Sequence, residues 1–160
     1  MCLLVTLGLP SFSHLIQRQK LKATATEFYA AVNLTRAEAI RRCAQVSLIA
    51  LDHKDWNSGW KIIINESDEP SSNDHILFQH EPLTDTYQIT HNFTDSSQTY
   101  ISYSGQGRSR TNLSSQQPLA GTVSMTLGEM TKRIKVNFLG RARLCDPTTD
   151  ITCNDSQTNN

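Results

Sequence analysis

The sequence lacks a hydrophobic run long enough to cross a membrane. A spanning helix needs about 20 mostly apolar residues, whereas the apolar run at residues 2–9 is about half that length. The run also lacks the basic start and the small-residue cleavage site of a secretory signal. Two explanations stay open: residues 1–11 are either the buried start of a helix or the truncated remnant of a transmembrane helix. In the second case, Pro10 would kink the helix where it leaves the bilayer.

Apolar residues are scarce, and the common catalytic motifs are missing. Hydrophobic side chains make up 38% of the 160 residues, which predicts one domain with a small core and a large solvated surface. There is no nucleophile elbow, phosphate-binding loop or zinc-protease motif, and the five histidines are scattered rather than set at metal-ligand spacing. The sequence therefore favours a protein without catalytic residues, a metal site, a cofactor or a small-molecule substrate.

There is no excess charge of either sign, but the two signs are separated along the chain. Residues 61–100 carry one basic and seven acidic side chains, whereas residues 101–160 carry seven basic and four acidic ones. The acidic block is most simply a solvated surface, or one that faces a partner protein. The basic C-terminal third is a candidate anion-binding surface.

The sequence does contain one long helical pattern, between Phe12 and Cys43. Seven small or apolar residues recur at alternating spacings of three and four, and no Gly or Pro interrupts the run. They predict an amphipathic helical spine at 12–43. At about 1.5 Å per residue, this helix would be longer than the domain and would project from it. Cys43, the last of the seven, is expected to be a small buried hydrophobic residue. The seven are Leu21, Ala25, Phe28, Val32, Thr35, Ala39 and Cys43.

After the helix, short β-branched or apolar runs alternate with polar turns. No second helix is available as a crossover, so the strands should pair mainly antiparallel. The predicted fold class is α+β: a long N-terminal helix packed on a globular β domain at 44–145, followed by a polar tail at 146–160. A Gly-, Ser- and Gln-rich segment at 104–119 is expected to be a long surface loop. The expected strands are 45–51, 60–65, 76–80, 86–93, 99–103, 122–127, 133–139 and 141–145.

The strand expected at 133–139 has a clear alternation of apolar and polar residues. Ile134, Val136 and Phe138 should face one way, and Lys135 and Asn137 the other.

Two of the four cysteines lie close together near the C-terminus. Cys145 and Cys153 bracket a short polar loop, CDPTTDITC. A loop this short is easily closed by a disulfide, and such bonds persist outside the reducing cytosol. Metal binding by the pair is the weaker alternative, because no histidine lies at ligand spacing.

The order of these segments resembles the FimT/FimU minor type IV pilins and the related H-type minor pseudopilin of type II secretion. LPSFSHLIQRQKL resembles the stretch where that family's membrane helix becomes the soluble helix, and AVNLTRAEAIRRCAQVSL resembles the helix end and first strand. WNSGWKIIIN is similar to the tryptophan-bearing second strand. ISYSGQGR and KRIKVNFLGRARLC are similar to the Gly-containing segment before the last hairpin and to the C-terminal strand with its Gly-Arg turn. The resemblance covers roughly Leu9 to Cys145.

The resemblance implies a type IV pilin-like fold and assembly with other major and minor pilins in a pilus or pseudopilus. It also implies an inner-membrane anchor in the full-length protein and a periplasmic domain. Members of the family begin with a short basic leader ending in Gly, then Phe-Thr-Leu and a Glu. The sequence contains none of these, so Met1 is expected to fall within the membrane helix. The FimT branch is associated with DNA uptake in natural transformation, and its C-terminal Gly-Arg-x-Arg motif is implicated in binding DNA.

Gly140 to Arg143 match this motif position by position. In an extended chain, Arg141 and Arg143 point to the same side, where two guanidinium groups can engage neighbouring phosphates with forked hydrogen bonds. Gly140 would let the backbone turn tightly. Alternatively, the arginines are solvated on an edge strand, where positive charge blocks unwanted strand pairing. Five more cations could widen the patch: Lys132, Arg133 and Lys135 on the preceding strand, and Arg108 and Arg110 if the long loop folds over it.

These observations predict a minor type IV pilin that binds DNA through its phosphates. Such binding is largely independent of base sequence and depends steeply on salt. The alternative is a minor pilin or type II secretion pseudopilin that acts only in filament assembly. A third possibility, an enzyme, has no supporting group of residues in the sequence.

Overall fold

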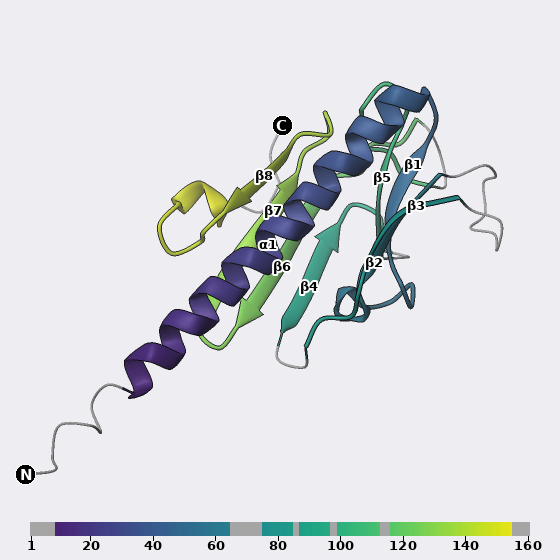
Figure 1. The fold of residues 1–160 in the computed structure, drawn as a ribbon. Coiled ribbons are helices and arrows are strands. Elements are labelled where there is room, and N and C mark those ends of the chain that lie inside the picture. The colour runs from purple at the N-terminus through teal and green to yellow at the C-terminus, as the bar shows by residue number, and fades with distance from the viewer. Residues whose placement is uncertain (1–8, 65–74, 85–86, 97–98, 113–115, 155–160) are drawn as a thin grey trace, which may run out of the picture.

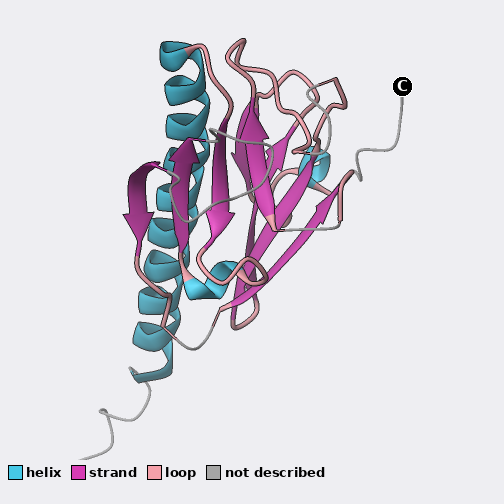
Figure 2. Ribbon diagram, turned by 90° about the vertical axis from the view of Figure 1, so that its right-hand side faces the viewer, coloured by secondary structure: helices cyan, strands magenta, loops and turns pink. Residues whose placement is uncertain are grey.

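One helix, α1 (Leu9–Arg42), runs the length of the molecule, with the β domain packed along it (Figure 1, Figure 2). The computed structural model describes residues 9–64, 75–84, 87–96, 99–112 and 116–154. The predicted helix is therefore present, with slightly earlier ends. Its first described turn contains Pro10, which is tolerated there because the first N–H groups of a helix have no partner within it. None of the helices in the described residues is long and apolar enough to cross a membrane.

The N-terminal part of α1 projects beyond the sheets (Figure 1). Side chains at 13–20 are exposed or half-buried, and Leu21 is the first of the described side chains to be buried. Leu15 and Ile16 are 52% and 42% exposed, so the projecting part carries apolar side chains that the domain does not cover. Most of the predicted membrane-helix remnant, residues 1–11, lies outside the described residues.

The C-terminal end of α1 corrects the prediction for Cys43, which is exposed rather than buried. Its φ of 51° takes the chain out of the helix. The N–H of Cys43 donates to the carbonyl of Ile40 at 3.3 Å, and the N–H of Ala44 donates to that of Ala39 at 3.3 Å. This pair of hydrogen bonds forms a Schellman C-cap, with a cysteine where glycine is usual. The apolar spacing runs one turn further than the helical backbone, so the cysteine side chain leaves the buried stripe.

Two four-stranded antiparallel sheets follow the helix, with strand orders β3-β2-β1-β5 and β4-β6-β7-β8. All eight expected strands are present, with ends shifted by at most three residues. Their bounds are β1 (Val46–Ala50), β2 (Trp60–Ile64), β3 (His75–His80), β4 (Gln88–Phe93), β5 (Tyr100–Tyr103), β6 (Gly121–Leu127), β7 (Met130–Val136) and β8 (Ala142–Cys145). Two short 3-10 helices, η1 (Trp56–Ser58) and η2 (Ile151–Cys153), complete the described elements.

The strand β7 differs most from its expected position, because it begins and ends three residues early. Leu127 pairs with Met130, so β6 and β7 are joined by a two-residue turn at Gly128 and Glu129. The φ of +62° at Gly128 suits such a turn. The strand therefore ends before Phe138, which is 45% exposed. The prediction that Phe138 shares the buried face of Ile134 is wrong.

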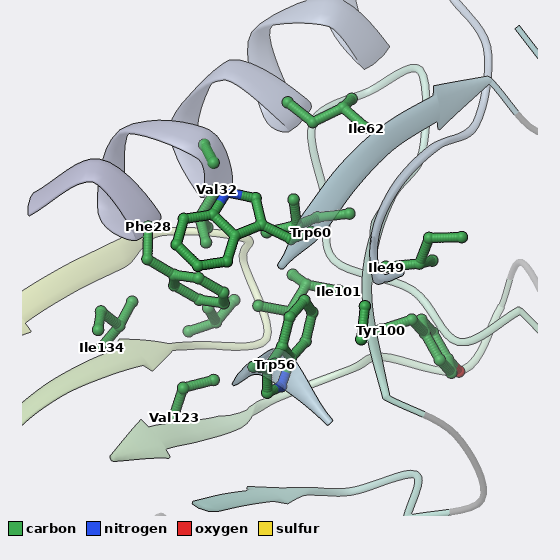
Figure 3. Packing of buried hydrophobic residues seen from close by; sticks show 14 of the residues in the cluster. Phe28, Val32, Ile49, Trp56, Trp60, Ile62, Tyr100, Ile101, Val123 and Ile134 are labelled. Carbon is green, nitrogen blue, oxygen red and sulfur yellow. The ribbon is translucent and has the colours of Figure 1, made fainter. Parts of the chain in front are cut away.

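The core lies between α1 and both sheets. Phe28 of α1 packs edge-on against Trp56 at 4.9 Å and Trp60 at 5.1 Å between ring centroids (Figure 3). Both tryptophans are fully buried, and the same cluster includes Val123 and Ile134 of the second sheet. Trp56 lies in a segment expected to be only a polar turn. Phe28 thus joins the helix to η1 and to β2 in a single core.

Candidate nucleic-acid interface

The Gly-Arg-x-Arg motif begins in a tight turn between β7 and β8. The N–H of Asn137 donates to the carbonyl of Arg141 at 3.1 Å, and the N–H of Gly140 donates to the carbonyl of Asn137 at 2.9 Å. The side-chain oxygen of Asn137 accepts from the N–H groups of Leu139 at 3.1 Å and Arg141 at 2.9 Å. Four hydrogen bonds therefore fix the backbone of this turn. We call residues 137–141 the arginine turn.

Gly140 is required in this turn for two reasons. Its φ is +78°, a conformation that residues with a Cβ rarely adopt. A Cβ at this position would also lie 2.5 Å from the carbonyl oxygen of Gly107 and 3.0 Å from the backbone nitrogen of Ser109. This agrees with the prediction that Gly140 allows a tight turn, and it shows that the turn packs against the segment after β5.

That segment is part of the stretch expected to be a surface loop, and it folds back on β5 rather than extending into solvent. Tyr103 and Ser109 form an isolated β-bridge, and the Ser109 hydroxyl donates to the carbonyl of Asn137 at 2.9 Å. The carbonyl of Gly107 accepts from Nε of Arg36 on α1 at 2.9 Å. The segment therefore lies against the arginine turn, with Arg108 between the contacting residues Gly107 and Ser109.

Two of the predicted cationic side chains have no hydrogen-bond or ion-pair partner in the described part of the chain. These are Arg141 and Arg108, and both are exposed. Arg110 is half-buried and donates from Nη1 to the carbonyl of Ser109 at 3.0 Å. Arg141 thus lies in the arginine turn, and Arg108 lies in the segment packed against that turn.

The predicted disulfide between Cys145 and Cys153 is formed, and the loop that it closes covers much of the remaining basic surface. Lys135 lies opposite Arg143 in the β7–β8 register, so their side chains share a face. On that face, Nζ of Lys135 donates to the carbonyl of Thr152 at 3.1 Å, and Nη2 of Arg143 donates to the Thr152 hydroxyl at 2.8 Å. The loop therefore lies across this part of the hairpin.

Arg133 is engaged by the end of the same loop. Its Nη1 donates to the carbonyl of Cys153 at 3.2 Å and to the side-chain oxygen of Asn154 at 2.9 Å. Lys135 is only 7% exposed. The disulfide loop therefore engages Nη1 of Arg133 and Nζ of Lys135, so these two side chains are less open to an anion than the sequence suggested.

Two aspartates of the disulfide loop offset the positive charge of the hairpin. Asp146 accepts from Nζ of Lys132 at 2.6 Å, and Asp150 lies 3.4 Å from Nη2 of Arg143. The Lys132 hydrogen bond is the main cause that lowers the pKa of Asp146 to about 2, with Thr148 also donating to it. The Thr152 hydroxyl and then the charge of Arg143 lower the pKa of Asp150. Of the two motif arginines, Arg141 is free of this loop and Arg143 is held by it.

The effect of Lys132 on Asp146 gives a testable pH dependence. Replacing Lys132 by Met is expected to raise the pKa of Asp146 from about 2 toward its ordinary value near ~4, but not fully, because Thr148 still donates. The folded-state pKa is depressed, so the stabilisation by this pair is complete above about pH 4 and is lost as the pH falls toward 2. Carboxyl titration by NMR measures the shift, with Lys20→Met as the control. An unchanged Asp146 pKa in Lys132→Met would contradict the assignment.

Sequence reasoning missed Asn137 and Arg36 as parts of this region. Asn followed by Gly three residues later is a common turn pattern, and it could have predicted the role of Asn137. The contact of Arg36 with Gly107 depends on the packing of α1 and has no local signal. No group of three or more His, Cys, Asp or Glu residues that could hold a metal ion occurs in the described part of the chain.

Comparison with known proteins gives one family and a set of similar structures. The family model described as Type II transport protein GspH matches residues 24–140. The type IV minor pilin FimU of Pseudomonas aeruginosa is 20% identical, with a TM-score of 0.64 over 82% of this chain and 92% of that chain. The minor pseudopilin EpsH of Vibrio cholerae is 18% identical, with a TM-score of 0.56 over 79% of this chain and 97% of that chain. The comparison with curated proteins gives no match.

These findings confirm the predicted α+β fold, a long helix packed on antiparallel sheets as in FimU and EpsH. They also confirm the resemblance noted in the sequence. The matched family region ends at Gly140, so Arg141 and Arg143 lie just beyond it.

Proposed function

The chain belongs to the GspH family of pilin-like proteins, and on this basis we propose that it is a minor type IV pilin that binds DNA and supports DNA uptake in natural transformation. The proposed contact is the Gly140–Arg143 segment, with Arg108 beside it. The binding is to phosphate groups, so it is largely independent of base sequence. The proposed role as a minor pilin includes an inner-membrane anchor, a periplasmic domain, and assembly with other major and minor pilins.

The observation that carries the DNA proposal is the state of Arg141. Its guanidinium is exposed and has no partner among the described residues, while four hydrogen bonds fix the turn that bears it. A fixed backbone lowers the entropy lost when an arginine side chain binds a phosphate. The side chain is therefore presented to an anion without first breaking an internal contact.

Arg143 supplies the second cation. Its hydrogen-bond and ion-pair partners within the described part of the chain are the Thr152 hydroxyl and Asp150, and its side chain is 49% exposed. Exposed ion pairs contribute little to stability, so Arg143 can exchange Asp150 for a phosphate at small cost. Lys132, Arg133 and Lys135 are held more firmly by the disulfide loop, and we assign them a secondary role, with Arg110 on the flank.

The family and the free end of α1 support the proposed role in filament assembly. Leu15 and Ile16 are exposed apolar side chains on the part of α1 that projects beyond the domain, and such a surface suits packing against other pilin helices. A pseudopilin that acts only in assembly is the second candidate. The aspartates that neutralise part of the hairpin favour it, since they reduce the attraction for a polyanion.

The salt dependence of DNA retardation tests the proposal. The purified 160-residue chain is expected to retard duplex DNA at 50 mM salt, with equal affinity for two duplexes of unrelated sequence. Contacts to two or three phosphates predict a log–log slope of about −2 to −3, so raising the salt to 200 mM should weaken binding roughly 10- to 40-fold. No retardation at 50 mM salt, or retardation that salt does not weaken, would favour the assembly-only role.

A further inference from the structure

Two large apolar side chains stand at the tip of the arginine turn. Phe138 is 45% exposed and Leu139 is 50% exposed. Fully burying such a side chain would contribute roughly 1.5–3 kcal/mol, so two adjacent exposed ones are unusual at a turn between strands. Polar residues are the usual choice there. The pair therefore needs an explanation other than folding.

The core does not use Phe138. The strand β7 ends at Val136, and Phe138 is neither in the buried cluster nor among the partly buried residues packed against it. Its ring makes no aromatic pair in the described part of the chain; the ring pairs there involve Phe28, Trp60 and His91 with their neighbours. The ring is therefore available to a ligand.

The backbone around Phe138 is held as firmly as that around Arg141. The Asn137 side chain accepts from the N–H group of Leu139 at the tip and from that of Arg141 after it. Gly140 packs against Gly107 and Ser109. The same hydrogen-bonded turn thus carries an exposed ring at Phe138 and, three residues later, the exposed guanidinium of Arg141.

This pairing of groups matches the chemistry of a single-stranded nucleotide. A base offers an apolar face that stacks on an aromatic ring, and its phosphate binds a neighbouring cation. In a duplex the base faces are covered by stacking, so only phosphates and groove edges remain accessible. Of the two forms of DNA, the single strand is therefore the one whose base faces are open to a ring at the tip of the turn.

We propose that the arginine turn prefers single-stranded DNA, with a base stacked on Phe138 while Arg141 binds the adjoining phosphate. This inference rests on the proposed DNA-binding function and specifies the form of DNA that the site takes. Leu139 lies on the same tip but has no aromatic face, so it provides a matched control for the stacking role.

The test compares the affinities of the 160-residue chain for a 20-nucleotide oligothymidine strand and for a 20-base-pair duplex, at low salt. The wild type is expected to bind the single strand at least fivefold more tightly. Phe138→Ala should weaken binding to the single strand at least fivefold and binding to the duplex less than twofold. Phe138→Trp should retain the preference, and Leu139→Ala should change neither affinity more than twofold. Thermal unfolding of each variant verifies that the fold is intact.

The outcomes separate this inference from the function on which it rests. Equal wild-type affinity for both probes, unchanged by Phe138→Ala, would overturn the single-strand preference and leave DNA binding standing. Equal losses in Phe138→Ala and Leu139→Ala on both probes would also overturn it, and would indicate a general apolar contact such as one with a neighbouring pilin. Absence of binding to either probe would overturn the proposed function and this inference together.

Discussion

Replacing Phe28 by alanine is expected to lower the free energy of unfolding by about 3–5 kcal/mol. Phe28 is completely buried and contacts the rings of both Trp56 and Trp60. Its removal leaves a cavity where α1 meets η1 and β2, and it also removes two edge-to-face ring contacts. Because a domain of this size is stable by only about 5–15 kcal/mol, this single change would remove a large part of its stability.

Urea denaturation of the wild type and the variant measures the difference. Leu34→Ala is the matched control, since Leu34 lies on the same helix but is 40% exposed. Its loss should cost less than about 1 kcal/mol. A Phe28→Ala cost no larger than that of the control would contradict the view that Phe28 joins the helix to the β domain.

The buried face of α1 was predictable because small and apolar residues spaced three and four apart lie on one side of a helix. Of the seven residues in the predicted stripe, the six from Leu21 to Ala39 are buried, including the polar Thr35. Thr35 fits because its hydroxyl donates to the carbonyl of Ala31 at 2.7 Å. Cys43 fails because apolar spacing does not indicate where the backbone leaves the helix, and the C-cap there uses no glycine.

The strands were predictable in number, and their ends depended on turn chemistry. In β6, the alternation of buried and half-buried residues from Gly121 to Leu127 follows the sequence closely. The position of β7 depended on the tight turn at Gly128, which the apolar pattern alone does not show. The prediction for Phe138 failed because of this shift, and the same shift places Phe138 at the tip of the arginine turn.

In the candidate site too, features set by neighbouring residues were predictable, and contacts between residues far apart in the sequence were not. The tight turn at Gly140 could be predicted because a glycine before an arginine strand is a local signal. The contacts of Lys135 with the Thr152 carbonyl and of Arg143 with the Thr152 hydroxyl could not, because they depend on where the disulfide loop lies in the fold. The disulfide holds the loop across the β7–β8 hairpin, where it contacts Arg133 and Lys135 and limits their access to an anion.

The second large effect concerns Arg141 and Arg143. Replacing both by alanine is expected to weaken DNA binding at least tenfold at low salt. The log–log slope of affinity against salt concentration should become shallower by about two, one for each lost phosphate contact. Arg141→Ala should have the larger single effect, because Arg143 must first give up its contacts with Thr152 and Asp150. Lysine at both positions should restore part of the affinity, since it retains the charge and loses the forked geometry.

The control for this variant is Lys20→Ala with Lys22→Ala, which removes the same charge from an exposed part of α1. Lys22 lies about 20 Å along the helix from Arg36, whose side chain contacts the segment beside the arginine turn. A loss of net charge alone would weaken DNA binding equally in both double variants. A localised site would weaken it in the arginine variant only.

Retardation of DNA by these two double variants, over a range of salt concentrations, distinguishes a DNA site at the arginine turn from attraction by net charge alone. Binding is expected to weaken at least tenfold at low salt in Arg141→Ala with Arg143→Ala, and to keep the wild-type affinity and salt slope in Lys20→Ala with Lys22→Ala. Unchanged binding in the arginine variant, or equal losses in the two, would contradict a DNA site at the arginine turn.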